Sequence, residues 1–130
     1  MKRKRILAVD DEPNILRSVK YYLEKAGYII QTAANGEEAL TRIQECVPDL
    51  VICDISMPKL DGMGFLKILK SKPDMSGIKV IFLTGKSSDE DLQKGWSSGA
   101  DYYITKPYSV QTLLKGVEFL LGKTKNYSTM

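Results

Sequence analysis

The chain has 130 residues, the length of one ordinary domain, and its 43% hydrophobic and 27% charged residues are the balance of a soluble globular protein. The net charge of +3 is too small to indicate nucleic-acid binding. The chain contains no histidine, which excludes Ser-His-Asp catalysis, histidine metal ligands and a role as a phosphohistidine donor.

The first half of the chain predicts two strand–helix units. Apolar residues over 6–9 predict a strand, and the segment from about 13 to 26 predicts a helix that Gly27 ends. Its inward residues recur at three- and four-residue steps: Leu16, Val19, Leu23 and Ala26. A second strand over 28–33 precedes a helix capped by Asn35. The inward stripe of that helix is Ala39, Leu40 and Ile43.

The second half predicts three more units, with strands over 50–53, 80–83 and 102–104. The first two strands are apolar at every position, as expected when both faces of a sheet are covered. The helices that follow are expected over about 64–70, after a cap at Ser88, and from a cap at Ser109 to about 121. Phe65, Leu66 and Leu69 share one side of the first of these helices, and the second carries Leu92 and Trp96. Trp96 is interpreted as partly core, with an exposed indole at a partner surface as the alternative.

This alternation of strands and helices predicts an α/β fold. Five strand–helix units imply a doubly wound, five-stranded parallel sheet with helices on both faces. We expect one domain over residues 1–121, and residues 122–130 as a polar tail or the start of a linker.

Polar residues follow several of the predicted strands: Asp10 and Asp11 after the first, Asp54 after the third, Thr84 after the fourth and Lys106 after the fifth. All therefore belong to the carboxyl edge, where open α/β sheets bind ligands. In a sheet ordered 2-1-3-4-5 the three aspartates converge. Their mutual repulsion either raises their pKa values or is relieved by a cation, and oxygen ligands select magnesium, manganese or calcium.

Each of these residues also has an ordinary structural explanation. Asp10 and Asp11 suit the dipole of the following helix, Asp54 suits a turn, Thr84 suits a strand and Lys106 suits a solvated loop. These explanations require complementary residues to meet by coincidence. A carboxylate beside a hard cation instead suits nucleophilic attack on a phosphoryl group. The sequence contains no GKS/T loop and no G-x-G-x-x-G, which disfavours a nucleotide site.

Residues from about 4 to 121 resemble the response-regulator receiver domain, the phospho-acceptor module of two-component signalling that chemotaxis regulators also contain. The motifs that carry the resemblance are Val9-Asp10-Asp11-Glu12-Pro13, Asp54 with Met57-Pro58 and Leu60-Asp61-Gly62, Leu83-Thr84-Gly85, and 99–107 with Lys106-Pro107 at its end. The resemblance implies the flavodoxin-like strand order 2-1-3-4-5.

The resemblance also implies the metal site. Asp54 would be the phosphorylated residue, in a reaction that requires Mg²⁺, with Mn²⁺ as an alternative. Asp11 would bind the metal directly and Asp10 mainly through water. Asp54 itself and the backbone carbonyl of Ser56 would complete the ligands from the chain.

A switch is implied by the same resemblance. Lys106 would pair with the phosphoryl group, Thr84 would supply the switch hydroxyl, and Tyr103 would be the switch aromatic. The Lys106–Pro107 bond would be cis. The face formed by the fourth helix, fifth strand and fifth helix would then change its affinity for a partner.

Three positions near the site depart from the family pattern. Gly85 stands where alanine is common after the switch threonine. This departure should be tolerated, because the position requires a small residue. Ser56 and Lys86 occupy two positions that influence the lifetime of the acyl phosphate, and their effects are opposed: a serine does little to obstruct attacking water, while Lys86 attracts the phosphoryl group.

A signalling module of this kind is not an enzyme, because it assists only its own phosphorylation and dephosphorylation. Its partners would be a histidine kinase or phosphotransfer protein and an output protein or domain, with a phosphorylation-dependent dimer left open. We expect no membrane partner, since apolar runs such as 50–53 end at a carboxylate. The basic start, Lys2 to Arg5, is interpreted as solvated and not as a nucleic-acid contact. Two cysteines without metal or redox spacing favour the cytoplasm.

Two enzymatic or cofactor functions remain as alternatives. An aspartate-nucleophile phosphohydrolase has a similar sheet but requires a D-x-D motif after the first strand, whereas this chain has adjacent Asp10 and Asp11. A flavodoxin-like cofactor binder would have a hydroxyl-rich phosphate loop where this chain has acids.

Overall fold

The computed structural model describes residues 3–55, 60–85 and 100–122. The expectations for Ser56, Lys86 and the helix after Ser88, with Leu92 and Trp96, lie outside the described residues.

The described elements follow the predicted alternation of strands and helices. They are β1 (Arg5–Val9), α1 (Pro13–Lys25), β2 (Ile29–Ala33), α2 (Gly36–Glu45), β3 (Leu50–Asp54), α3 (Gly62–Ser71), β4 (Lys79–Thr84), β5 (Tyr102–Thr105) and α5 (Val110–Leu121). Within the described ranges, no helix is long and apolar enough to cross a membrane.

Helix starts are set by capping side chains. Asn35 accepts a hydrogen bond from the Glu38 backbone N–H at 2.8 Å, and Ser109 accepts one from the Thr112 N–H at 3.1 Å, as predicted. The third helix begins earlier than the predicted 64, because Asp61 caps it by accepting from the Gly64 N–H at 2.8 Å. Glycines at the first and third positions hide this start from a propensity argument.

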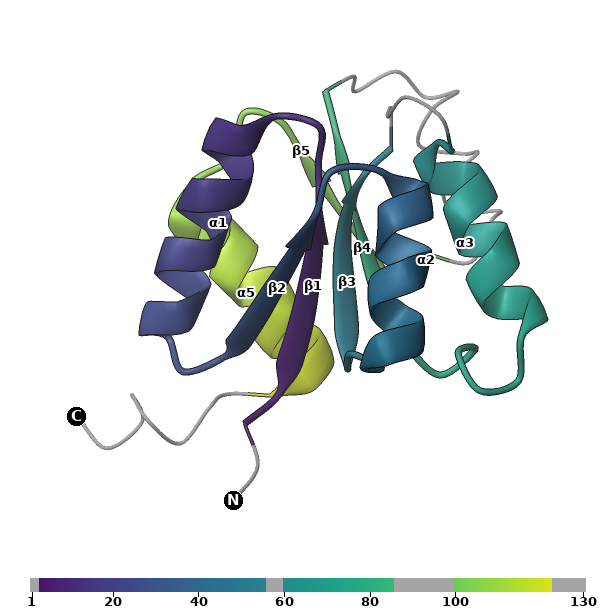
Figure 1. The fold of residues 1–130 in the computed structure, drawn as a ribbon. Helices are drawn as coiled ribbons and strands as arrows, with labels where there is room; N and C mark the ends of the chain where they lie inside the picture. Colours follow the sequence, from purple (N-terminus) through teal and green to yellow (C-terminus); the bar gives the residue numbers. More distant parts are fainter. Residues whose placement is uncertain (1–2, 56–59, 86–99, 123–130) are drawn as a thin grey trace.

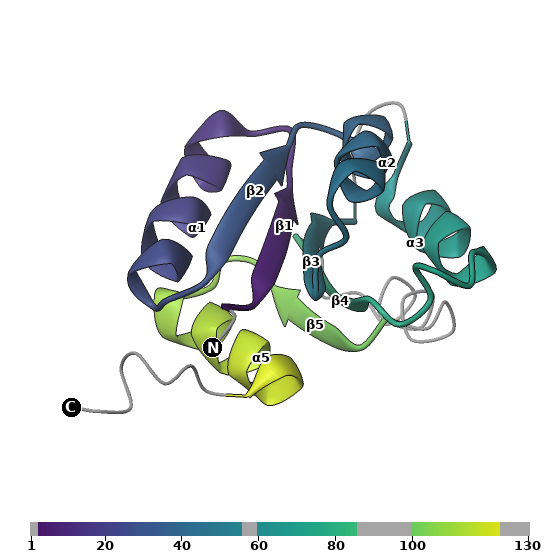
Figure 2. The ribbon, with the colours of Figure 1, turned by 60° about the horizontal axis from the view of Figure 1, so that its bottom comes forward.

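The five strands form one parallel sheet in the order β2-β1-β3-β4-β5, which confirms the predicted doubly wound fold. Helices α1 and α5 cover one face, and α2 and α3 cover the other (Figures 1 and 2). From β1 the chain continues to β2 on one side, and from β3 it continues to β4 on the other, so the topology switches between β1 and β3. Because β1 and β3 pair in parallel, their carboxyl ends lie side by side.

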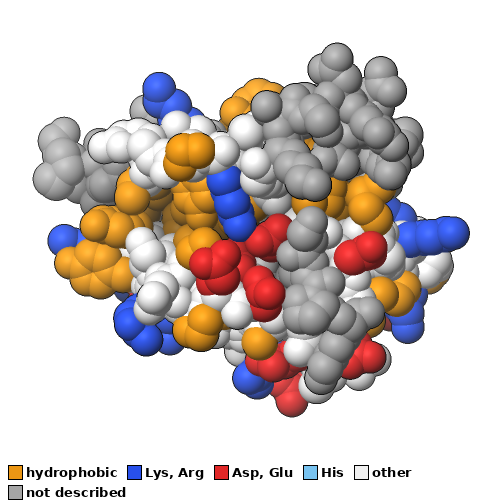
Figure 3. Space-filling model, turned by 90° about the horizontal axis from the view of Figure 1, so that it is seen from above, with side chains coloured by type: hydrophobic (Ala, Val, Ile, Leu, Met, Phe, Trp, Pro, Cys, Tyr) orange, Lys and Arg blue, Asp and Glu red, His pale blue; other side chains and the backbone are white. Residues whose placement is uncertain are grey.

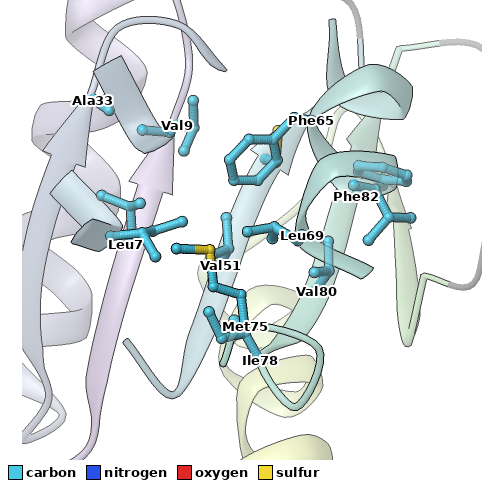
Figure 4. Close-up of a cluster of buried hydrophobic side chains, with 14 of the residues drawn as sticks. Leu7, Val9, Ala33, Val51, Phe65, Leu69, Met75, Ile78, Val80 and Phe82 are labelled. Carbon is cyan, nitrogen blue, oxygen red and sulfur yellow. The ribbon is translucent and has the colours of Figure 1, made fainter. Parts of the chain in front are cut away.

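Two hydrophobic layers lie on the two faces of the sheet. Along β1, Leu7 and Val9 enter the layer under α2 and α3, while Ile6 and Ala8 enter the layer under α1 and α5. Figure 4 shows Phe65 and Leu69 of α3 packed over strand residues of the first layer. All of β3 is buried, which accounts for its unbroken apolar run.

The amino edge of the sheet is held by two carboxylates that precede strands. Asp49, before β3, accepts from the Arg5 N–H at 2.8 Å, and Asp101, before β5, accepts from the Val80 N–H at 2.8 Å. The Asp101 N–H in turn donates to the Val80 carbonyl at 3.0 Å. Each carboxylate therefore satisfies the first amides of a neighbouring strand.

Replacing Asp101 with alanine should lower the free energy of unfolding by about 1–2 kcal/mol, because the Val80 amide loses its acceptor inside the sheet. Asp101→Asn keeps a side-chain oxygen and should lose less than half as much. Urea unfolding midpoints of the two variants measure this difference. Equal losses would mean that the hydrogen bond is not what Asp101 contributes.

Candidate functional site

The candidate site lies at the carboxyl edge of the sheet, where the central strands and β5 end. Asp10 follows β1, Asp54 ends β3, Thr84 ends β4 and Lys106 follows β5. Figure 3 looks down on this edge and shows acidic side chains gathered around one basic side chain. Residues far apart in the sequence thus meet because parallel strands end at one rim.

Lys106 joins the two buried carboxylates. Its ammonium donates a hydrogen bond to Oδ2 of Asp54 at 2.8 Å, and it lies 3.8 Å from Oδ2 of Asp10. Asp10 is 1% exposed and Asp54 is 6% exposed. The Lys106 backbone N–H also donates to the Thr84 carbonyl at 2.7 Å, which fixes the start of the β5–α5 loop against β4.

Burial perturbs the carboxyl group of Asp10. Burial raises the pKa of Asp10 from 3.8 to about 6, with smaller contributions from the charges of Asp54 and Asp11, although the Glu12 backbone hydrogen bond and Lys106 oppose this. Oδ1 accepts the Glu12 N–H at 3.0 Å. Oδ2 is buried and accepts no hydrogen bond from the residues that the structure describes.

The charge on Lys106 is stabilised by the acids around it. Burial by itself lowers the pKa of the Lys106 ammonium, but the hydrogen bond to Asp54 and the negative charges of Asp54 and Asp10 outweigh it, and the pKa is raised overall. Lys106 therefore remains charged at neutral pH and offsets only part of the negative charge at this edge.

The same edge offers oxygen atoms suited to a hard cation. Asp10, Asp11 and Glu12 each have one carboxylate oxygen that lies within 4.8 Å of the other two. Asp11 and Glu12 are exposed, whereas Asp10 is buried, and its Oδ2 has no hydrogen-bond partner among the described residues. A buried carboxylate oxygen without a hydrogen bond, in an all-oxygen cluster, fits a divalent ion such as Mg²⁺. Sequence reasoning did not propose Glu12 as a ligand, although the Asp-Asp-Glu run contains it.

The two expected switch residues lie on adjacent strands. Thr84 is 1% exposed at the end of β4, beside Thr105 of β5. Tyr103 is half-buried on β5, and its ring meets the Phe82 ring edge-on with centroids 5.9 Å apart. The structure thus brings Thr84 to the carboxyl edge with the other site residues and places Tyr103 two positions back along the neighbouring strand. The Lys106–Pro107 bond is cis, as the resemblance implies.

An apolar hollow of about 560 Å³ borders the site between α1 and the start of α5. Ile15 and Val19 of α1 line one side, Tyr108 and Val110 line the other, and Lys106 lies where the hollow meets the acids. Figure 3 shows apolar side chains beside the basic one. The hollow was missed by sequence reasoning, because its walls belong to helices that are far apart in the chain.

Comparisons with known proteins identify relatives of this chain. The family model described as the response regulator receiver domain matches residues 6–118. The probable transcriptional regulator ycf27 of Cyanophora paradoxa is 43% identical over 124 residues, which cover 95% of this chain and 51% of that protein. The regulatory protein PhoP of Bacillus subtilis is 38% identical, over 94% of this chain and 50% of that protein. The chain therefore spans about half the length of these curated relatives.

Solved structures show the same fold. The chemotaxis response regulator CheY4 of Vibrio cholerae is 35% identical, with a TM-score of 0.87 over 92% of this chain and all of that chain. The signal receiver domain of a histidine kinase from Syntrophus aciditrophicus is 36% identical, with a TM-score of 0.86 over 98% of this chain and 96% of that one. Because the family model matches residues 6–118 and the strand order is the one that the resemblance implies, the chain belongs to the response regulator receiver domain family.

Proposed function

We propose that the chain accepts a phosphoryl group on Asp54 from a histidine of a partner kinase or phosphotransfer protein. The observation that carries the proposal is the buried Asp54 carboxylate held at 2.8 Å by the Lys106 ammonium, with Asp10 on the other side of that ammonium. The lack of histidine in this chain agrees with an external donor. Receiver domains are generally not classical enzymes, and this chain would assist only its own modification.

The phosphoryl transfer would use Asp54 as the nucleophile. One carboxylate oxygen forms a bond to phosphorus while the bond from phosphorus to the donor's imidazole nitrogen breaks, and its electron pair stays on the imidazole. Lys106 loses one carboxylate partner and gains a phosphoryl oxygen as its new one. The burial of Asp54 limits the access of water to the reacting carboxylate.

Magnesium would be held by Asp10, Asp11, Asp54 and the Ser56 carbonyl, the last of which lies outside the described residues. Glu12 is a further acid within reach of the same cluster. When bound, a divalent ion supplies positive charge against the repulsion of the acids and the phosphoryl oxygens. Mn²⁺ offers the same preference for oxygen ligands.

The proposed switch couples the site to the β4–β5 side of the sheet. Phosphoryl oxygens would give the Thr84 hydroxyl a new partner, and its inward shift would leave room for the Tyr103 ring. The two side chains lie on paired strands, and Tyr103 is directly opposite Phe82 in the register. The affected surface would comprise β5, α5 and the helix expected after Ser88, which lies outside the described residues. It would bind an output protein or domain, or a second phosphorylated copy.

The remaining expectations belong to the same proposal. Residues 1–121 would form the receiver domain and 122–130 a tail or the start of a linker. The protein would act in the cytoplasm without direct nucleic-acid contact by this domain. Turnover of a chromogenic phosphate ester would favour a phosphohydrolase instead, and flavin absorbance in the purified protein would favour a cofactor binder.

Incubation with acetyl phosphate and Mg²⁺ should modify the wild type at Asp54, and Asp54→Ala should abolish the modification because the nucleophile is lost. Intact-protein mass spectrometry after trapping of the acyl phosphate measures it, with Asp74→Ala, at an exposed acid, as the matched control. Modification that survives Asp54→Ala would place the acceptor elsewhere.

Lys106→Ala should still fold and bind Mg²⁺ at least as tightly as the wild type, because it removes a competing cation from Asp54 and Asp10. It should fail to pass the response to β5. The backbone amide signals of Tyr103 on adding beryllofluoride report that response by NMR. Lys115→Ala, at an exposed lysine of α5, should respond normally. An ordinary response in Lys106→Ala would remove this lysine from the mechanism.

Asp10→Asn should stabilise the fold while weakening Mg²⁺ binding. With a pKa of about 6, the native Asp10 binds a proton that the unfolded chain has already lost, so wild-type stability falls as pH rises from about 4 to 6. At pH 7 without metal, the variant should therefore be more stable by on the order of 2 kcal/mol. This gain should shrink toward pH 4 in urea unfolding with a chelator. A gain that does not depend on pH would show that carboxylate burial is not its cause.

A further inference from the structure

Leu60 lies in a notch between the starts of two helices. A Cβ built on Gly36, the first residue of α2, would lie 2.7 Å from the Leu60 carbonyl oxygen and 3.0 Å from its Cβ. A Cβ built on Gly64 of α3 would lie 2.9 Å from Cδ1 of the same leucine. The backbone of Leu60 therefore packs directly against α2, and the end of its side chain packs against α3.

The segment that begins at Leu60 leads straight back to Asp54. Two residues on, the Gly62 N–H donates to the Ile55 carbonyl at 3.0 Å, and the Ile55 N–H donates to the Leu83 carbonyl of β4 at 3.0 Å. A Cβ on Gly62 would lie 3.0 Å from the Asp54 carbonyl oxygen. The start of α3 thus lies on the backbone of the acceptor residue, and a shift at Leu60 reaches Asp54 over a short, tightly packed path.

We infer that Gly36 is a positioning residue for Asp54: its missing side chain lets the Leu60 carbonyl sit against α2, and this contact sets the acceptor backbone through Gly62 and Ile55. The inference rests on the proposed function for its effect on phosphorylation, but its structural part stands apart from it. The three atoms nearest to a Cβ built on Gly36 all belong to Leu60, so Leu60 is the first residue that an added methyl group would displace.

Three glycine-to-alanine variants separate this role from a general effect of an added methyl group. Gly36→Ala pushes on a backbone oxygen, which cannot rotate away. Gly64→Ala meets Cδ1 of Leu60 and, at 3.2 Å, Oδ1 of Asp61, both ends of side chains that can move. Gly77→Ala meets nothing within 4 Å. Alanine also has the better helix propensity, so propensity does not predict a loss of stability at position 36 or 64.

The variants are compared by Mg²⁺ titration calorimetry, by the rate of Asp54 modification with acetyl phosphate, and by amide NMR shifts in a chelator. Gly36→Ala should bind Mg²⁺ roughly 10-fold more weakly and should be modified at Asp54 roughly 10-fold more slowly. Small displacements of reacting or metal-supporting groups reduce affinity and rate by this much or more. Without metal, it should shift the amide signals of Asp54, Ile55 and Gly62. In Gly64→Ala and Gly77→Ala, the Mg²⁺ affinity and the modification rate should stay within about twofold of the wild-type values, a difference clearly smaller than the tenfold effect.

A folded Gly36→Ala with unchanged Asp54 and Gly62 amide signals would overturn the inference, as would equal effects of Gly36→Ala and Gly64→Ala. If Gly36→Ala does not fold, Leu60→Ala takes its place, because Cγ of Leu60 also lies against Gly36, 3.1 Å from a Cβ built there, and its removal loosens the same contact. Leu60→Ala should shift the amide signal of Asp54, and an unshifted Asp54 signal would overturn the inference. A wild type that is not modified at Asp54 would refute the proposed function, while the metal-free NMR comparison would still decide the role of Gly36.

Discussion

The shared ammonium of Lys106 is the interaction on which this site depends. Two carboxylates that are almost wholly buried face one positive charge, at 2.8 Å from Asp54 and 3.8 Å from Asp10. Taking charges out of water is costly, and one lysine compensates two acids incompletely. The pKa of Asp10 is raised mainly by burial, and Lys106 offsets this only in part. Natural folds keep such an unfavourable arrangement where a ligand or a reaction uses it. The imbalance therefore favours binding of a cation and, beside it, transfer of a charged group.

The alternation of strands and helices and most of the site residues could be predicted from local pattern, whereas the strand order was implied by the family resemblance. Unbroken apolar runs at 50–53 and 80–83 indicate strands covered on both faces, and β3 and β4 are buried at all but one of their positions. Asn35 and Ser109 cap the helices they were expected to cap. Because the polar residues follow the strands directly, a parallel sheet brings Asp10, Asp54 and Lys106 to one edge. These are consequences of local pattern and strand direction.

Features that depend on burial and on contacts between distant parts of the chain could not be predicted from local sequence pattern. Asp10 and Asp11 are adjacent in the sequence, yet the first is buried and the second exposed, and burial raises the pKa of Asp10. The start of α3 depends on the Asp61 cap, and the packing of Leu60 depends on two glycines from different helices. The apolar hollow beside Lys106 is likewise formed by α1 and α5 together. Sequence periodicity carries no information on such pairings.

The two carboxylates that hold the amino edge have a consequence for how this fold can vary. Asp49 and Asp101 bind the first amides of neighbouring strands at the opposite end of the sheet from the buried acids. The length of a strand separates the two groups, and sites without shared partners contribute to stability nearly additively. Mutations at the amino edge can thus raise the free energy of unfolding and offset the destabilising burial of acids at the carboxyl edge. Stability and chemistry can therefore evolve separately in this fold.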